Sequence, residues 1–273
     1  MNTRLNWVAT HCIAIAIAAA FVLPLIFICL TAVMPDEQAL TPDLWPKSWE
    51  WGNLATIFRT APLGRWLLNT VIYAALATVF TLVSAVPTAY ALARYKLRGT
   101  NLAFLLVVAM MLLPPQVLVV PMYLIWASLG LTGSIWPLVI PLLLGDAFSI
   151  FLLRQFLLTI PEDYADAARI DGCGELRVLL RVVLPMMKPA LAAVGLFTFF
   201  YAWNDYYGPL IYLSEMPDQW TLSIGLASFK SVHSVQWNLT MAATVIVMAP
   251  LIIVFFFAQK AFIEGVTLTG VKG

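Results

Sequence analysis

The chain has 273 residues, of which 62% are hydrophobic and only 11% are charged. An ordinary soluble domain is roughly half apolar and about one quarter charged, so this composition is typical of a protein embedded in lipid. The net charge of +1 excludes a broad basic or acidic surface for nucleic acid or another polyanion.

A membrane-spanning helix needs about 20 mainly apolar residues. We therefore predict an all-α membrane protein with six transmembrane helices and with both termini on one side. The first apolar stretch is longer than the core of a cleaved signal peptide, about 7 to 15 residues, so we expect that helix to be retained. The predicted spans are residues 8–34, 66–92, 101–128, 134–158, 189–213 and 239–262.

Lys and Arg are concentrated on one side of this topology, which holds 11 of the 15. Cytoplasmic loops retain positive charge, so we expect this side to face the cytoplasm, with both termini there. Residues 35–65 then lie outside the membrane. The positive side contains Arg4, Arg94, Lys96, Arg98, Arg154, Arg169, Arg177, Arg181, Lys188, Lys260 and Lys272.

Tryptophan is frequent in the outer segment, at Trp45, Trp49 and Trp51, and Trp66 follows it. Because the indole ring suits the boundary between membrane and water, the pattern favours an aromatic belt over a platform on which sugar rings stack.

The segment from Thr159 to Lys188, between the fourth and fifth predicted spans, is too polar for the bilayer and too well patterned for a slack linker. Pro161 and the two acidic residues after it favour a helix start, because Pro is accepted in the first turn and acidic side chains complement the helix dipole. We expect Gly172 and Gly174 to end this helix. The segment is thus predicted to contain two short helices.

The second short helix is predicted to run from Glu175 until Pro185 stops it, with Arg177 and Arg181 away from its apolar face. That apolar face is predicted to contain Leu176, Leu179, Leu180 and Val183.

The first short helix carries small side chains that would let another surface approach its backbone, at Ala165, Ala167 and Ala168. Charged side chains for pairing are present at Asp166, Arg169 and Asp171. The pattern fits a docking surface, and it fits equally an amphipathic linker on the membrane, so the residues alone leave both interpretations open.

The run Asp166-Ala167-Ala168 is followed after three residues by Gly172 and after nine more by Val182-Val183-Leu184-Pro185. This resembles the EAA loop of bacterial binding-protein-dependent ATP-binding-cassette importers, which reads Glu-Ala-Ala, then Gly, then Ile-x-Leu-Pro at the same spacing. Asp166 stands for Glu and Val182 for Ile, and the shorter carboxylate leaves its ion-pair partner open.

Other segments are similar to the carbohydrate branch of that family, the maltose and glycerol-phosphate type. The resemblance implies the ABC transmembrane type-1 fold and a permease subunit, not an enzyme, that couples ATP hydrolysis in a partner ATPase dimer to import of a sugar or related solute. It also implies a second permease, a different chain, and an extracytoplasmic solute-binding protein. The segments are WGNLATIFRTAPLGRWLLNT, AYALARYKLRG, LLPPQVLVVPMYL, AWNDYYGPL and TLTGVKG.

The resemblance assigns residues 1–65 to an N-terminal helix and outer segment, 66–262 to the core with its loop at 159–188, and 263–273 to a cytoplasmic tail. The residues implied to couple to the ATPase are Asp166, Ala167, Ala168, Asp171, Gly172, Leu184 and Pro185. Tail residues implied to contact the ATPase are Gly270, Lys272 and Gly273.

The sequence contains no G-x-x-x-x-G-K-[ST] phosphate loop, so we expect ATP and Mg²⁺ to be bound by the partner ATPase and no cofactor by this chain. His11 and His233 have no carboxylate or Cys at ligand spacing, and no acid, base and nucleophile set is present. We predict neither a metal site nor a catalytic site.

Two acidic residues fall well within predicted spans, Asp146 and Asp205. A central Asp costs about 2.5 to 3.5 kcal/mol on insertion scales, so each should face protein or water. An alternative function is an ion-coupled secondary transporter that uses both, but such proteins often contain an internal repeat, and none is convincing here. Asp205 and its neighbours Trp203, Asn204, Tyr206 and Tyr207 suit either an interhelical lock, which we favour, or a solute path.

Overall fold

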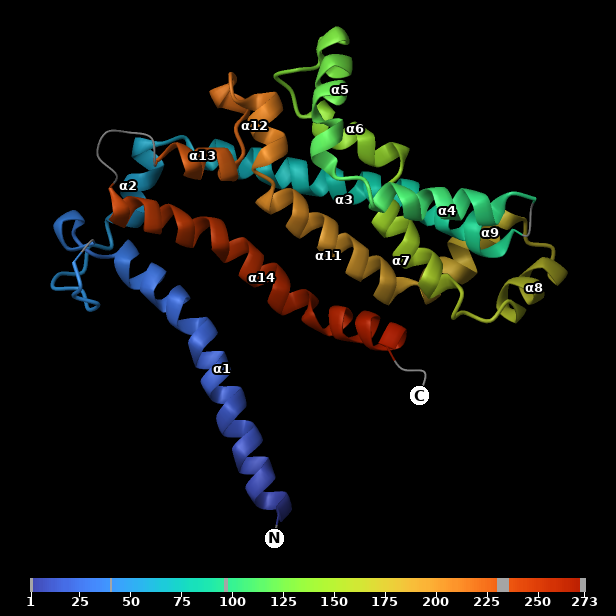
Figure 1. The fold of residues 1–273 in the computed structure, drawn as a ribbon, viewed down its shortest axis with the longest axis horizontal. Helices are drawn as coiled ribbons and strands as arrows, with labels where there is room; N and C mark the ends of the chain where they lie inside the picture. The colour runs from blue at the N-terminus through green and yellow to red at the C-terminus, as the bar shows by residue number, and fades with distance from the viewer. Residues whose placement is uncertain (1, 40, 96–97, 230–235, 271–273) are drawn as a thin grey trace. The chain divides into compact units, whose positions relative to one another are not determined.

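The computed structural model describes residues 2–39, 41–95, 98–229 and 236–270, which are helical for most of their length and contain no strand (Figure 1). The all-α prediction is confirmed. The helices are α1 Asn2–Ala32, η1 Asp36–Gln38, α2 Asn53–Thr60, α3 Leu63–Arg94, α4 Thr100–Met111, α5 Pro115–Ser128, α6 Trp136–Leu144, α7 Ala147–Leu157, α8 Asp163–Ile170, α9 Glu175–Val178, η2 Leu179–Val183, α10 Leu184–Met186, α11 Lys188–Asn204, α12 Tyr207–Leu213, η3 Pro217–Gln219, α13 Leu222–Ser228 and α14 Trp237–Gly270.

Four helical stretches in the described residues are long and apolar enough to cross a membrane. They are residues 6–32, 63–94, 136–157 and 237–259, and two bent helix pairs raise the number to as many as six. The predicted six-span membrane fold agrees with this upper number.

The predicted span at residues 101–128 is sharply bent, because α4 and α5 meet at an angle of 97°. The chain is extended at Pro114, with φ −62° and ψ 127°. Pro115 has no N–H for the carbonyl four residues earlier, and the residue before a proline is disfavoured in helix. Two consecutive prolines therefore break the helix.

The predicted span at residues 189–213 is also interrupted, because α11 ends at Asn204 and α12 begins only at Tyr207. Pro209 is the physical reason, since it has no N–H with which to bond the carbonyl of Asp205. That carbonyl accepts a hydrogen bond from the Ser223 hydroxyl at 2.6 Å instead. The bent pair that qualifies as a span joins α11 to residues 175–186, at 81°.

The chain divides into two compact units, residues 1–65 with 225–252, and residues 66–224 with 253–273. In the first unit the amide of Asn53 donates to the carbonyls of Ala32 at 3.1 Å and Met34 at 2.9 Å, which lie at the end of α1. Trp49 and Trp51 stack with ring centroids 5.7 Å apart and are exposed. The aromatic belt stays a prediction.

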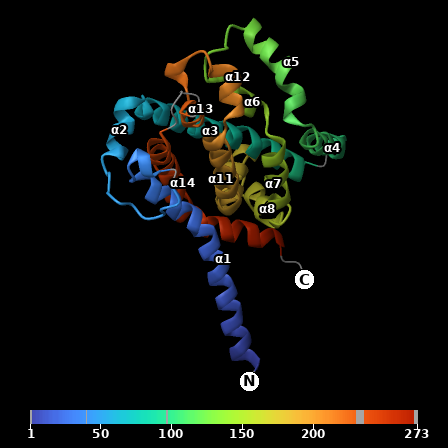
Figure 2. The same ribbon diagram turned by 60° about the vertical axis from the view of Figure 1, so that its left-hand side comes forward.

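The second unit has its core where α3, α7, α8, η2 and α11 meet. Helix α7 packs between α4 and α11 (Figure 2). The largest fully buried side chains in this core include Leu153, Leu157, Val178 and Met187. We call the end of this unit that carries residues 159–188 the loop end.

Two arginines join α3 to α7 at the loop end. The guanidinium of Arg94, at the end of α3, donates to the carbonyls of Leu157 at 3.0 Å and Ile160 at 2.7 Å. In return Arg154 of α7 donates through Nε to the carbonyl of Leu92 at 3.1 Å. Helix ends leave carbonyls without an intrahelical partner and carry negative partial charge, so a cation is favourable there.

The Arg94 side chain is only 5% exposed, so its carbonyl contacts are screened from solvent. Replacing Arg94 by Gln should lower the free energy of unfolding by about 1–3 kcal/mol, because charged donors to buried acceptors are lost. Thermal unfolding of the purified chain in detergent measures the change. The control is Arg59→Gln on the exposed face of α2, expected to stay within about 0.5 kcal/mol of wild type. Equal melting temperatures for both variants would contradict the expectation.

Candidate functional site: the loop of residues 159–188

Helix α8 begins at Asp163 and ends at Ile170, which confirms both predicted boundaries. Its end is closed by two backbone bonds, from the N–H of Gly172 to the carbonyl of Arg169 and from the N–H of Cys173 to the carbonyl of Ala168, each 3.0 Å. Gly172 has φ +80°. This is the Schellman arrangement, in which a left-handed residue after the helix satisfies its last carbonyls. A glycine is required there because side chains disfavour that conformation.

Two of the three alanines of α8 pack inside the subunit. Ala165 is 2% exposed and Ala168 is 9% exposed, and both belong to the core that contains Val178 and Leu179. Residues three apart lie on one face of a helix, so these two small side chains bring α8 close to its own subunit. Ala167 is exposed.

The outward face of α8 is partly apolar. Ile170 is 86% exposed and Tyr164 is 54% exposed. Asp166, Asp171 and Gly172 are exposed as well. Ile170 and Tyr164 are therefore available for contact with another molecule.

The predicted apolar face of the second helix is also wrong in part. Leu179 and Val183 are buried, but Leu176 is 70% exposed and Leu180 is 51% exposed. The buried face is completed by Val178, which is fully buried. Apolar residues surround most of this helix, so their spacing does not identify which side packs on the core.

The sequence predicted that Pro185 stops the helix. This prediction is wrong, because the chain continues in α10 to Met186. The preceding residues form a π-helix, η2, in which the N–H of Leu184 bonds the carbonyl of Leu179. This wider turn accommodates a proline that cannot donate. The bend of 81° follows at Met187. Leu184 is half-buried and Pro185 is exposed.

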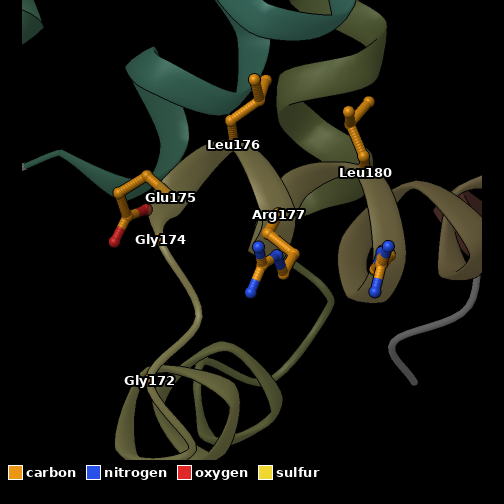
Figure 3. A pocket seen from close by; sticks show the side chains of 7 residues that line it. Gly172, Gly174, Glu175, Leu176, Arg177 and Leu180 are labelled. Carbon is orange, nitrogen blue, oxygen red and sulfur yellow. The ribbon is translucent and has the colours of Figure 1, made fainter.

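An open groove of about 580 Å³ lies beside α9. Leu176 and Leu180 point to one side of the helix and Arg177 points to the other (Figure 3). The groove is lined by Gly172, Gly174, Glu175, Leu176, Arg177, Leu180 and Arg181.

Glu175 is the centre of a polar network that the sequence did not reveal. Its carboxylate accepts bonds from Arg169 Nε at 2.7 Å and from the hydroxyls of Tyr90 at 3.1 Å and Tyr95 at 3.3 Å. The hydrogen bond from Arg169 lowers the pKa of Glu175, and the tyrosine hydroxyls lower it further. Arg169 also pairs with Asp166 at 2.6 Å, which supplies the ion-pair partner left open above.

The acidic residue Asp205 is held by polar groups from several segments. Its carboxylate accepts a bond from the hydroxyl of Tyr73 of α3 at 2.8 Å and from the N–H of Gly208 at 3.0 Å. Trp203, two residues before Asp205 and on α11, is 2% exposed. These contacts have the form of an interhelical lock.

Other polar residues at the helix breaks have separate surroundings. Asp146 caps the start of α7 by accepting the N–H of Ser149 at 2.8 Å. Asn204 donates to the carbonyl of Phe200 at 2.8 Å and is exposed. Tyr206 and Tyr207 are 43% and 53% exposed.

The tightness of the Asp205 lock can be tested at Gly208. A Cβ there would lie 2.6 Å from Asp205 Oδ2 and 3.0 Å from Leu138 Cδ2, so Gly208→Ala should lower the free energy of unfolding by about 1–3 kcal/mol through overpacking. In the control Gly195→Ala the Cβ meets Thr78 Cγ2 at 3.6 Å, and the helix should gain up to about 1 kcal/mol. Thermal unfolding in detergent measures both. Equal stability of the two variants would exclude a tight lock.

Two of the three implied tail residues, Lys272 and Gly273, lie outside the described residues, and Gly270 is the last residue of α14. Within the described ranges, no three or more His, Cys, Asp and Glu residues are grouped so as to hold a metal ion.

Residues 68–267 match the family described as binding-protein-dependent transport system inner membrane component. The chain is 31% identical to the arabinooligosaccharides transport system permease protein AraQ of Bacillus subtilis (strain 168), over 93% of this chain and 91% of that protein. It is 32% identical to the sn-glycerol-3-phosphate transport system permease protein UgpE of Pectobacterium atrosepticum, over 97% of each.

The fold is similar to a chain in the crystal structure of a bacterial ABC transporter involved in the import of the acidic polysaccharide alginate. The TM-score is 0.82 with 22% identity, over 96% of this chain and 98% of that chain.

Proposed function

This chain belongs to the family of binding-protein-dependent transport system inner membrane components, and we propose that it imports a sugar or a sugar-related solute. It is a multi-pass membrane permease subunit of an ATP-binding-cassette importer. The proposed solute class is supported by the names of AraQ and UgpE, which refer to arabinooligosaccharides and sn-glycerol 3-phosphate.

The loop of residues 159–188 is the proposed contact with the ATPase. The observation that carries this proposal is the outward face of α8, where Tyr164, Ala167 and Ile170 are exposed on a helix whose other side is packed into its own subunit. Asp166 and Asp171 add charge at the edges of that face. Leu184 and Pro185 contribute indirectly, by shaping the turn that leads into α11.

The proposed orientation places this loop and both termini in the cytoplasm, because the loop side holds 11 of the 15 Lys and Arg residues and cytoplasmic loops retain positive charge. The outer segment 35–65 then faces the solute-binding protein. A partner ATPase dimer binds ATP and Mg²⁺, and the second permease is a different chain. Gly270, Lys272 and Gly273 remain proposed tail contacts with the ATPase.

Asp205 and Trp203 form the proposed interhelical lock, while Asn204, Tyr206 and Tyr207 remain candidates for the solute path because they are exposed. An ion-coupled transporter is not supported. Asp146 and Asp205, the two acids that it would use, both accept backbone N–H groups of their own chain.

Purification of the tagged chain from its native membrane tests the function. We expect an ATPase, a second permease and a solute-binding protein to co-purify, since the family acts as an assembly of these parts. Mass spectrometry identifies them, and a purification from untagged cells is the control. Recovery of the chain without any ATPase would contradict the proposal.

Substitutions at Gly172 test the proposed docking of α8. A Cβ at Gly172 would meet nothing within 4 Å in the subunit itself, so an effect on transport comes from its backbone conformation at φ +80° or from a partner docked against it. Side chains disfavour that region by about 1–2 kcal/mol, and Asn tolerates it best. Transport should therefore decrease in the order Gly, Asn, Ala, Val, while the subunit stays folded.

The assay is uptake of labelled arabinotriose or sn-glycerol 3-phosphate into vesicles that contain the assembled importer. Gly174→Ala is the matched control, because Gly174 has φ −71° and a Cβ there also meets nothing within 4 Å. Wild-type uptake by Gly172→Val would refute the docking proposal.

A further inference from the structure

Glu175 joins three parts of the subunit through one carboxylate. Arg169 of α8 donates to it at 2.7 and 3.2 Å, and the hydroxyls of Tyr90 and Tyr95 donate from α3 and from the residue after it, at 3.1 and 3.3 Å. Arg169 in turn holds Asp166 at 2.6 Å. One network of polar side chains therefore connects α8, α9 and the end of α3.

The backbone between α8 and α9 provides little of this connection. Residues 171–174 form the turn, and a Cβ on Gly172 or Gly174 would meet nothing within 4 Å. The turn is thus open around both glycines. The pair of Arg169 and Glu175 closes it from one side.

The α3 side of the network is a firm attachment. Tyr90 is 3% exposed, and its ring belongs to the core together with Ala89 and Leu153. Its ring therefore has a fixed position, and only its hydroxyl reaches Glu175. Tyr95 lies at the surface, 37% exposed, with its ring 6.1 Å from that of Tyr90.

We propose that Glu175 is a positioning residue that transmits movement of α8 to α3, through Arg169 on one side and the hydroxyls of Tyr90 and Tyr95 on the other. This inference rests on the proposed function, in which α8 receives the movement of the ATPase. Without Glu175, α8 still packs on Val178 and Leu179, and Arg94 of α3 still pairs with Glu162 at the start of α8 at 3.6 Å, but the hydrogen bonds that join Arg169 to Tyr90 and Tyr95 are lost.

Exposure makes the network suitable for a clean test. The side chains of Glu175 and Arg169 are 41% and 35% exposed, and exposed ion pairs contribute little to stability. Variants of these residues should therefore fold and assemble. A change in the ATP hydrolysed per molecule transported can then be distinguished from a loss of folded, assembled protein.

The test measures ATP hydrolysis and uptake in the same vesicles, with the assembled importer and with arabinotriose and sn-glycerol 3-phosphate as probes. Glu175→Gln and the double variant Tyr90→Phe/Tyr95→Phe should each raise the ATP hydrolysed per probe molecule, by up to about fivefold, which corresponds to the upper value for an exposed ion pair. The double variant removes only two hydroxyl groups, so it still tests the network if the Glu175→Gln variant does not assemble.

Combining the variants identifies a shared network. The triple variant should be no worse than Glu175→Gln alone, because residues of one network are not additive. Glu215→Gln, an exposed acid outside the network, is the control and should keep the wild-type ratio. Wild-type ratios in both Glu175→Gln and the tyrosine double variant would overturn the inference.

A structural measurement separates this inference from the proposed function. Spin labels are placed at Asp163 of α8 and Thr88 of α3, both exposed, after the three free cysteines are replaced by Ser. Glu175→Gln should broaden the distribution of distances between the labels, and an unchanged distribution would overturn the inference. If the wild-type importer transports neither probe, the result contradicts the proposed solute class. The distribution of distances between the labels still tests the role of Glu175.

Discussion

The loop end of this subunit depends on how helix ends satisfy their last carbonyl groups, because carbonyls buried inside the protein need a partner other than water. Arg94 of α3 bonds the carbonyls of Leu157 and Ile160, and Arg154 of α7 bonds that of Leu92. Each helix thus caps the other. Since arginine stays charged at all relevant pH values, this contact persists, and residues 159–188 start from a fixed point at the end of α7.

The same constraint explains the helix breaks inside the apolar segments. Proline removes a donor at Pro209, and the carbonyl that loses its partner is bonded by Ser223. Gly145 has φ +124° where α6 ends, and Asp146 then caps α7. An acidic side chain within an apolar segment is tolerated when it completes such a break, which accounts for Asp146 and Asp205 without an ion-coupled function.

The sequence predicted what depends on local properties. The length and apolarity of a segment identify the spans. The end of α8 at Gly172 could be predicted because the left-handed backbone conformation of a glycine depends on local sequence. The size of the bend at Pro115 was not predicted, because the sequence marks where a donor is lost but not how far the chain turns. Glu175 was missed because Tyr90 lies 85 residues away in the sequence, and no local pattern connects them. The sequence left the role of the alanines open, because small side chains suit contact within the subunit as well as with a partner.

Helix α8 has two attachments of different stiffness. Ala165 and Ala168 pack it against η2, and close-packed surfaces resist displacement. Its connection to Tyr90 and Tyr95 passes through the ion pair of Arg169 and Glu175, which is partly exposed, and such pairs are worth about 0–1 kcal/mol. A force on Ile170 therefore moves α8 and η2 together, and the contacts of Glu175 with the two tyrosines carry the proposed movement on to α3. Bonds that are short but weak suit a subunit that alternates between two conformations.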